Sequence, residues 1–282
     1  SPFDKTFVHS NDFPQTAHAN YMSSAQLVNH QFHQAKQSIN APTVVFIHGL
    51  FGDMNNLGVI ARALSDNYNI LRVDLRNHGH SFHSETMNYD VMADDVWQLI
   101  DYLQLDKVIL IGHSMGGKTA MKMTALQPQR VDKLVVIDIA PVANSSAGHD
   151  DVFRGLFAVK KAQPQTRQQA KLILETEIAD PSVVQFMLKS FEPTSSEYFR
   201  FNLTALFEHY SELMDWQEVF ANTPTLFIKG GLSSYIKPEY TETILKQFPN
   251  ATSFTINGCG HWVHAEKPDF VIRAIDRFLN KN

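Results

Sequence analysis

The stretch Val108-Ile-Leu-Ile-Gly-His-Ser-Met-Gly-Gly-Lys-Thr119 decides the fold. Its apolar start, residues 108–111, predicts a buried parallel strand, and residues 115–127 predict a helix. Between them stands Gly112-x-Ser114-x-Gly116. A serine on such a sharp strand-to-helix turn projects its hydroxyl above the sheet edge, and the glycines let strand and helix pass without Cβ clashes. The pattern therefore indicates a serine nucleophile beside a helix N-terminus, whose free N–H groups suit a developing oxyanion.

The same stretch also fits a phosphate-binding loop, Gly-x4-Gly-Lys-Ser/Thr, running from Gly112 to Thr119. In that alternative, Asp138 at the end of the next apolar run would hold magnesium. The order of elements argues against it, because two strand–helix units precede the loop. It also leaves the glycine-rich motifs at His48 and His261 without a role.

Composition sets the class of protein. The 282 residues, 44% of them hydrophobic, suffice for a core with an inserted subdomain. The net charge of −5 gives no support for nucleic-acid or anionic-membrane binding. The single cysteine, Cys259, rules out an intrachain disulfide framework and fits a cytoplasmic protein. No apolar run approaches about 18 residues and no secretory signal pattern is present, so stable membrane insertion is not expected. Nothing in the sequence signals an oligomeric state.

Strand-like and helix-like segments alternate on both sides of the quoted stretch. Strands are predicted at residues 43–47, 69–74, 108–111, 133–139, 225–228 and 252–256, and helices at about 56–64, 89–103, 115–127, 239–247 and 269–279. Residues 26–38 alternate weakly and predict edge strands. This alternation predicts an α/β fold with a mostly parallel sheet, helices on both faces, and ligands at the carboxyl ends of the strands.

Residues 141–222 break this alternation. Helices are predicted there at about 150–161, 166–178, 181–190, 196–209 and 215–221. We interpret residues 141–222 as a helical cap, residues 22–140 and 223–282 as the core, and residues 1–21 as an N-terminal tail or arm. Most aromatic residues of the cap must pack its own interior, and a minority would line an acyl pocket. The candidate pocket residues are Phe153, Phe201 and Trp216 of the cap, with Phe51 and Trp262 of the core.

Catalytic side chains are expected just past the strand ends. Ser114 needs a base, because a serine hydroxyl is a poor nucleophile near neutral pH. His261 is the best candidate, since it follows the last strand in a glycine-rich loop and imidazole has a reference pKa of about 6.5. His264 is a lesser candidate for the base.

The segment His48-Gly-Leu-Phe-Gly52 predicts an oxyanion loop. Its donor would be the backbone N–H of Leu50, or less favourably that of Phe51, acting with the N–H of Met115. The alternative is a plain glycine turn into a helix, and His48 itself is expected to be structural.

Three nearby histidines, His78, His80 and His83, raise the question of a metal site. No cysteine or carboxylate stands at ligand spacing beside them, and polar loop side chains commonly bond backbone groups. No metal is therefore expected.

Five motifs together resemble the YbfF-type bacterial esterases. They are Phe46-Ile-His-Gly-Leu-Phe-Gly52, Asp74-Leu-Arg-Asn-His-Gly79, Gly112-His-Ser-Met-Gly-Gly-Lys118, Ile137-Asp-Ile-Ala-Pro141 and Gly260-His-Trp-Val-His-Ala-Glu-Lys-Pro268. The resemblance runs from about residue 26 to the C-terminus. It implies an α/β-hydrolase core with a helical cap and cofactor-free hydrolysis of esters or thioesters, with activity that could extend to acyl-CoA.

The acid of the site is the least obvious member. In most α/β-hydrolases it follows the strand that here ends at Ile228, but Ser233 or Ser234 occupies that place. Glu239, the nearest downstream acid, stands at a predicted helix start, where a carboxylate also suits the helix dipole. The resemblance implies Asp138, one strand after the serine strand. We favour Asp138, keep Glu239 as the alternative acid, and hold a lone serine–histidine dyad as a third option.

The sequence thus predicts a serine hydrolase that cleaves esters or thioesters of short to medium apolar acyl groups through an acyl-enzyme. Its partner would be a small-molecule substrate. A C–C bond hydrolase or a perhydrolase would share the same triad. A ligand-binding protein on the same fold is the non-enzyme alternative, because fold does not imply function.

Overall fold

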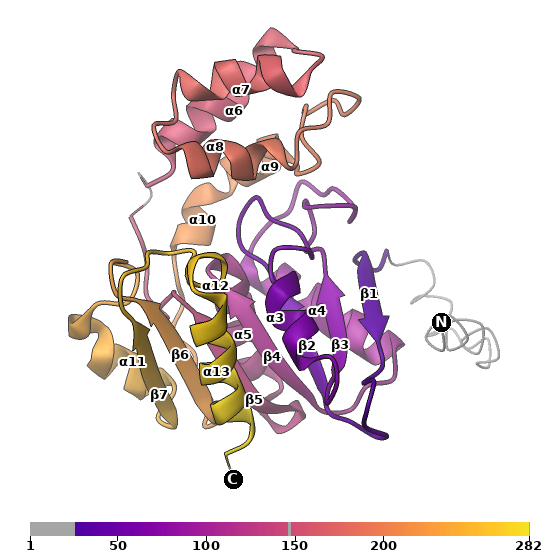
Figure 1. Cartoon of the computed structure of the whole chain (residues 1–282), viewed down its shortest axis with the longest axis vertical. Helices are drawn as coiled ribbons and strands as arrows, with labels where there is room; N and C mark the ends of the chain where they lie inside the picture. The colour runs from indigo at the N-terminus through magenta and orange to yellow at the C-terminus, as the bar shows by residue number, and fades with distance from the viewer. Residues whose placement is uncertain (1–25, 146–147, 282) are drawn as a thin grey trace, which may run out of the picture.

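The computed structural model describes residues 26–145 and 148–281 of the chain, so the predicted tail at residues 1–21 lies outside the described residues. A seven-stranded sheet forms the centre of the molecule (Figure 1). Its strands are β1 (His30–His33), β2 (Thr43–Ile47), β3 (Asn69–Val73), β4 (Val108–His113), β5 (Val131–Ile137), β6 (Thr225–Gly230) and β7 (Ala251–Ile256). The predicted strands are confirmed, with bounds that differ by a few residues.

The strand order is β1-β3-β2-β4-β5-β6-β7. The edge strand β1 pairs antiparallel with β3, and every other neighbouring pair is parallel. All six residues of β4, the central strand, are buried. Parallel strands covered on both faces need such near-continuous apolar sequences. The expected α/β fold with a mostly parallel sheet is confirmed.

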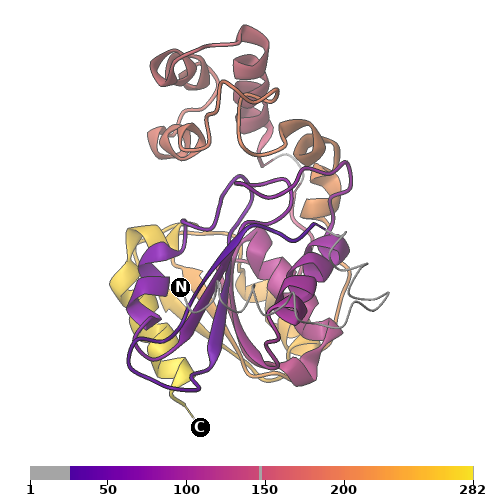
Figure 2. The same cartoon turned by 90° about the vertical axis from the view of Figure 1, so that its right-hand side faces the viewer.

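Helices cover both faces of the sheet (Figure 2). On one face lie α4 (Tyr89–Tyr102), α5 (Met115–Leu126) and α11 (Thr241–Gln247), and on the other lie α3 (Gly58–Leu64), α12 (Val263–Glu266) and α13 (Pro268–Leu279). Strand side chains alternate between the two cores, so that Val45 packs toward α4 and α5 while Val44 packs toward α3 and α13. In the described ranges, no helix has the length and apolar character needed to cross a membrane.

Residues between β5 and β6 form a helical segment above the sheet (Figure 1). Its helices are α6 (Asp150–Ala162), α7 (Arg167–Glu175), α8 (Pro181–Leu188), α9 (Leu203–Glu208) and α10 (Tyr210–Met214). The helix predicted at 196–209 is wrong in its first half, because Tyr198 has a φ of 66° and Phe191 bridges Phe199 as a β-pair. The helix predicted at 215–221 is wrong, because α10 ends at Met214, Asp215 is extended, and no helix follows before β6.

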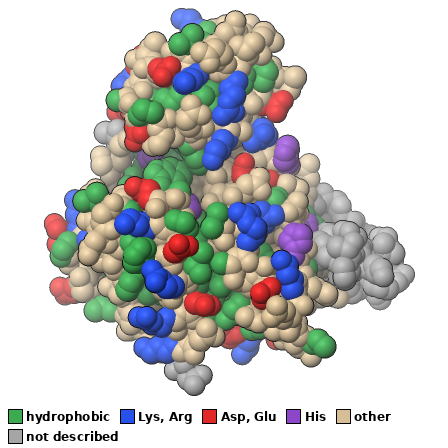
Figure 3. Space-filling view, viewed as in Figure 1, with side chains coloured by type: hydrophobic (Ala, Val, Ile, Leu, Met, Phe, Trp, Pro, Cys, Tyr) green, Lys and Arg blue, Asp and Glu red, His purple; other side chains and the backbone are tan. Residues whose placement is uncertain are grey.

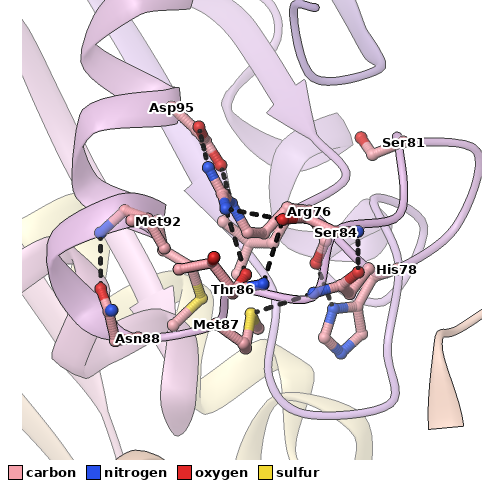
Figure 4. A network of polar contacts seen from close by, with 12 residues as sticks. Arg76, His78, Ser81, Ser84, Thr86, Met87, Asn88, Met92 and Asp95 are labelled. Atoms are coloured by element: carbon pink, nitrogen blue, oxygen red, sulfur yellow. Dashed lines mark hydrogen bonds and ion pairs between the residues drawn. The ribbon is translucent and has the colours of Figure 1, made fainter. Parts of the chain in front are cut away.

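The loop between β3 and α4 supports the helical segment. Arg76 fixes this loop through two bonds to Asp95 on α4, Nε to Oδ2 at 2.6 Å and Nη2 to Oδ1 at 2.8 Å (Figure 4). Asn77 O then accepts a hydrogen bond from the Asn202 N–H at 2.8 Å, just before α9. The helical segment is therefore held by a loop at the carboxyl ends of the strands, where the candidate catalytic residues also lie.

Candidate active site

The turn from β4 to α5 carries Ser114 in a strained conformation, with φ 55° and ψ −120°. The turn is tight enough to require its glycines. A Cβ on Gly112 would lie 2.2 Å from Gly116 O, and a Cβ on Gly116 would lie 2.2 Å from Ile47 O. Strain of this kind is held by the surrounding packing and concentrates at functional sites. The hydroxyl of Ser114 consequently stands at the carboxyl edge of the sheet.

Asp138 follows β5 directly and is fully buried, with a φ of 54°. Its carboxylate accepts three hydrogen bonds. Oδ1 accepts from the Gly230 N–H at 3.0 Å, and Oδ2 accepts from Ser233 Oγ at 2.5 Å and His261 Nδ1 at 2.6 Å. Three converging donors fix the orientation of this carboxylate.

His261 lies between the other two side chains. Its Nδ1–H donates to Asp138, and its Nε2 stands 2.9 Å from Ser114 Oγ, which donates the serine proton to it. The ring of Tyr235 stacks on the imidazole with centroids 4.0 Å apart. The structure thus brings together the three residues that the sequence placed at three different strand ends.

The alternative acid lies elsewhere. Glu239 sits in the 3-10 turn Pro238–Tyr240, where it is exposed to solvent. Of the two serines, Ser233 and Ser234, at the place expected for the acid, Ser233 donates to Asp138. This contact joins the end of β5 to the loop after β6, and no local pattern in the sequence indicates it.

Two further histidines lie behind His261. His113 Nε2–H donates to the backbone oxygen of His261 at 2.8 Å. His264, the lesser candidate for the base, packs against His113 with ring centroids 4.3 Å apart. Both are buried. Burial lowers the pKa of His264 to about 4, and burial with its neighbouring imidazoles lowers that of His113 well below its usual value. Both rings are therefore neutral near pH 7, and His113 holds the backbone of the base.

This burial makes a prediction about acid stability. Because the folded-state pKa of His264 lies below its unfolded value of 6.5, the unfolded chain binds more protons between those two pKa values. The free energy of unfolding should therefore fall as the pH drops from about 6.5 toward 4, by about 2 kcal/mol at pH 4.5 for this one histidine. Urea unfolding at pH 7 and 4.5 measures the effect. His264→Leu should lose less stability on acidification than wild type, whereas the exposed control His80→Leu should behave as wild type.

The expected oxyanion loop follows β2. The N–H of Phe51 is occupied, since it donates to His78 Nε2 at 3.0 Å. Burial lowers the pKa of His78 to about 3, so its ring is neutral and its Nε2 can accept this bond while Nδ1–H donates to Arg76 O. Leu50 and Met115, in contrast, both line the cavity at Ser114. The arrangement favours Leu50 over Phe51 as the donor.

Two of the remaining histidines, His48 and His83, bond to backbone groups. His48 is buried, its Nδ1–H donates to Gly49 O at 2.8 Å, and its Nε2 accepts from the Leu75 N–H at 3.0 Å. His83 Nε2–H donates to Arg200 O at 2.8 Å, and His80 is exposed. Each of these side chains thus fixes or borders a loop, and within the described ranges they form no cluster able to hold a metal ion.

A cavity of about 50 Å³ opens at Ser114. Its lining includes Gly49, Leu50, Ser114, Met115, His261 and Trp262, together with Tyr89, Asn144, His149, Leu213, Met214 and Tyr235. Hydrophobic side chains gather in the hollow where the helical segment meets the core (Figure 3). The cavity is small beside ordinary ligand pockets of roughly 300–1,000 Å³.

Of the five candidate pocket residues, Trp262 lines this cavity. Phe51 packs on Phe153 and Phe201 with ring centroids 5.5 and 5.1 Å apart, and all three are buried core residues outside the lining. Trp216 packs on Tyr89, and its Nε1–H donates to Gln247. The lining residues Tyr89, His149 and Tyr235 were missed, because their side chains reach the cavity from separate elements.

Comparisons with known proteins agree with this geometry. A family model described as the alpha/beta hydrolase fold matches residues 42–268. The chain is 67% identical over 282 residues to a putative esterase/lipase of Haemophilus influenzae, covering 100% of this chain and 98% of that protein. It is 47% identical over 247 residues to Esterase YbfF of Escherichia coli, covering 87% and 96%. It is 36% identical over 248 residues to the mouse sn-1-specific diacylglycerol lipase ABHD11, covering 84% and 81%.

Among solved structures, a marine microorganism esterase superposes with a TM-score of 0.83 at 31% identity, covering 90% of this chain and 100% of that one. The chain belongs to the α/β-hydrolase fold family. The resemblance to YbfF-type esterases is confirmed.

Proposed function

We propose that this protein is a serine hydrolase that cleaves carboxylic esters through an acyl-enzyme. The observation that carries the proposal is the continuous chain of hydrogen bonds from Ser114 Oγ through the His261 ring to buried Asp138, at 2.9 and 2.6 Å. This chain supplies a nucleophile, a base and an orienting acid. The names of the relatives, esterase, lipase and diacylglycerol lipase, support ester substrates.

In the proposed first step, Ser114 Oγ attacks the ester carbonyl and its proton passes to His261 Nε2. The carbonyl oxygen becomes an oxyanion, which the N–H groups of Leu50 and Met115 would stabilise. Each such donor is typically worth about 3–4 kcal/mol in the transition state. Asp138 holds the Nδ1–H tautomer and stabilises the imidazolium that forms.

In the second half, His261 returns the proton to the leaving alcohol, and the acyl group stays on Ser114. A water then enters, His261 removes its proton, and the hydroxide attacks the acyl-enzyme. The proton returns to Ser114 Oγ as the carboxylic acid leaves. A thioester would follow the same steps with a thiol as leaving group, so acyl-CoA thioesters belong to the proposed substrate range.

We further propose that residues 141–222 act as a cap over this site. Four lining residues, Asn144, His149, Leu213 and Met214, come from this segment. The small cavity supports short acyl groups as the preferred substrates. The single cysteine, Cys259, is free and buried, which supports the proposed cytoplasmic location.

Hydrolysis of p-nitrophenyl acetate, butyrate, hexanoate and octanoate, and of acetyl-CoA and hexanoyl-CoA, tests the proposal. We expect turnover that a fluorophosphonate abolishes by labelling Ser114, with kcat/KM highest for the short acyl groups because the cavity is small. The thioesters show whether the range includes acyl-CoA. A protein that neither turns over any ester nor reacts with the fluorophosphonate would instead be a ligand-binding member of the family.

A further inference from the structure

Lys118 is the feature of the quoted stretch that the proposed chemistry leaves unused. It lies on α5, one helical turn after Ser114, and its side chain is 1% exposed. It also lines the cavity at the nucleophile. A fully buried lysine is rare unless its charge is compensated, so its surroundings must provide that compensation.

The ammonium group is compensated by neutral acceptors and ring faces. Its Nζ donates to Asn144 Oδ1 at 2.9 Å, to Met214 O at 3.4 Å and to Asp215 O at 3.5 Å. It lies 5.9 Å from the ring centroids of both Tyr89 and Trp216, within reach of a cation–π contact. In the part of the chain that the structure describes, Lys118 forms no ion pair.

These acceptors belong to the two chain segments that connect the helical segment to the core. Asn144 lies where the chain leaves the core, and Met214 and Asp215 lie where α10 ends and the chain returns. The two segments are also bonded to each other, since the Asn144 N–H donates to Met214 O at 2.7 Å. The last carbonyls of a helix carry partial negative charge, which favours a cation there. Lys118 therefore joins both connections at one point.

An ammonium group has three N–H donors and no acceptor. The three oxygens named above use all of them. Burial lowers the pKa of Lys118 to about 8, so the charged form, which needs these three partners, predominates at pH 7. These partners are all protein oxygens, and this separates Lys118 from a lysine that is free to bind a ligand.

We propose that Lys118 is a positioning residue that locks the connections of the helical segment and thereby sets the acyl-chain selectivity of the cavity. Leu213 and Met214 line the same cavity as Ser114. Their carbonyls are held by core side chains, Leu213 O by Tyr89 Oη–H at 2.7 Å and Met214 O by Lys118. A wall held at successive carbonyls cannot retreat to admit a longer acyl chain. This inference rests on the proposed ester hydrolysis.

The test compares kcat/KM for p-nitrophenyl hexanoate with that for p-nitrophenyl acetate in Lys118→Met, Asn144→Leu and the double variant. Removal of the lock should raise the hexanoate-to-acetate ratio about fivefold in each single variant, and the double variant should gain little more, because both changes break one contact. A ratio is independent of the amount of folded enzyme. Lys122→Met is the matched control, since Lys122 lies on the same helix but pairs with Asp90 at 3.0 Å.

An unchanged ratio in Lys118→Met or in Asn144→Leu, measured on folded protein that still reacts with a fluorophosphonate, would overturn the proposal. Asn144→Leu leaves α5 intact, so the test stands even where Lys118→Met fails to fold. Turnover of the same two esters by the wild-type protein separates the proposed ester hydrolysis from the proposed role of Lys118. Its absence would refute ester hydrolysis, whereas normal turnover with an unchanged ratio would refute only the role of Lys118.

Discussion

Ser114→Ala is expected to lower kcat for ester hydrolysis by about 10⁴-fold or more, because nothing else in the site can form the acyl-enzyme. The residual rate would come from binding and from the oxyanion donors, which are backbone groups and survive the change. Steady-state hydrolysis of p-nitrophenyl acetate measures kcat. Mass spectrometry after incubation with a fluorophosphonate checks that the label is lost at the same time.

The fold of this variant should be retained. Serine and alanine carry the same Cβ at the strained φ of 55°, so the substitution adds no backbone strain. Ser234→Ala is a suitable control, because Ser234 is exposed in the loop after β6. Wild-type turnover in a folded Ser114→Ala protein would refute the serine mechanism, and a loss in both variants would point to damage outside the nucleophile.

The core of the fold was predictable because its pattern is local. The inner parallel strands are apolar runs with turn signals at both ends, as in Thr43–Ile47, and the long covering helix Tyr89–Tyr102 shows an apolar face. Short-range periodicity carries this information. The strand order is not local, but the alternation of strands and helices restricts it.

The helical segment was less predictable, because distant contacts decide its ends. Trp216 follows α10 outside any helix, and its Nε1–H donates to Gln247 Oε1 at 2.8 Å, 31 residues away. Tyr198 adopts a positive φ beside the bridge from Phe191 to Phe199. Aromatic spacing in these stretches resembles a helical face, and nothing nearby in the sequence reveals the competing contacts.

The site shows the same division. Ser114 and His261 could be placed from the sequence, because glycine-rich turns after strands mark them. The choice between Asp138 and Glu239 could not be made from spacing, since it depends on which side chain crosses the sheet edge to meet Nδ1. The cavity lining was still harder to predict. The sequence pattern does not distinguish an aromatic side chain that faces a cavity, such as Trp262, from one that packs in the core, such as Phe153.

Asp138→Asn is expected to lower kcat by about 10³–10⁴-fold while the protein still folds. Three donors, from Gly230, Ser233 and His261, converge on this carboxylate. Asparagine replaces one acceptor oxygen with an NH₂ group, so at least one donor must face another donor. Where that donor is His261 Nδ1, the ring adopts the other tautomer, and Nε2–H can no longer accept the serine proton. Asparagine tolerates the positive φ of 54°, so the backbone should be preserved.

Glu239→Gln is the matched control, because it likewise removes one carboxylate charge, but at an exposed position. It should keep kcat within about twofold of wild type, as surface substitutions away from special contacts usually do. Kinetics of both variants with p-nitrophenyl acetate, alongside their rates of fluorophosphonate labelling, distinguish three outcomes. Loss confined to Asp138→Asn supports Asp138 as the acid, loss confined to Glu239→Gln transfers the role to Glu239, and full activity in both leaves a serine–histidine dyad that needs no acid.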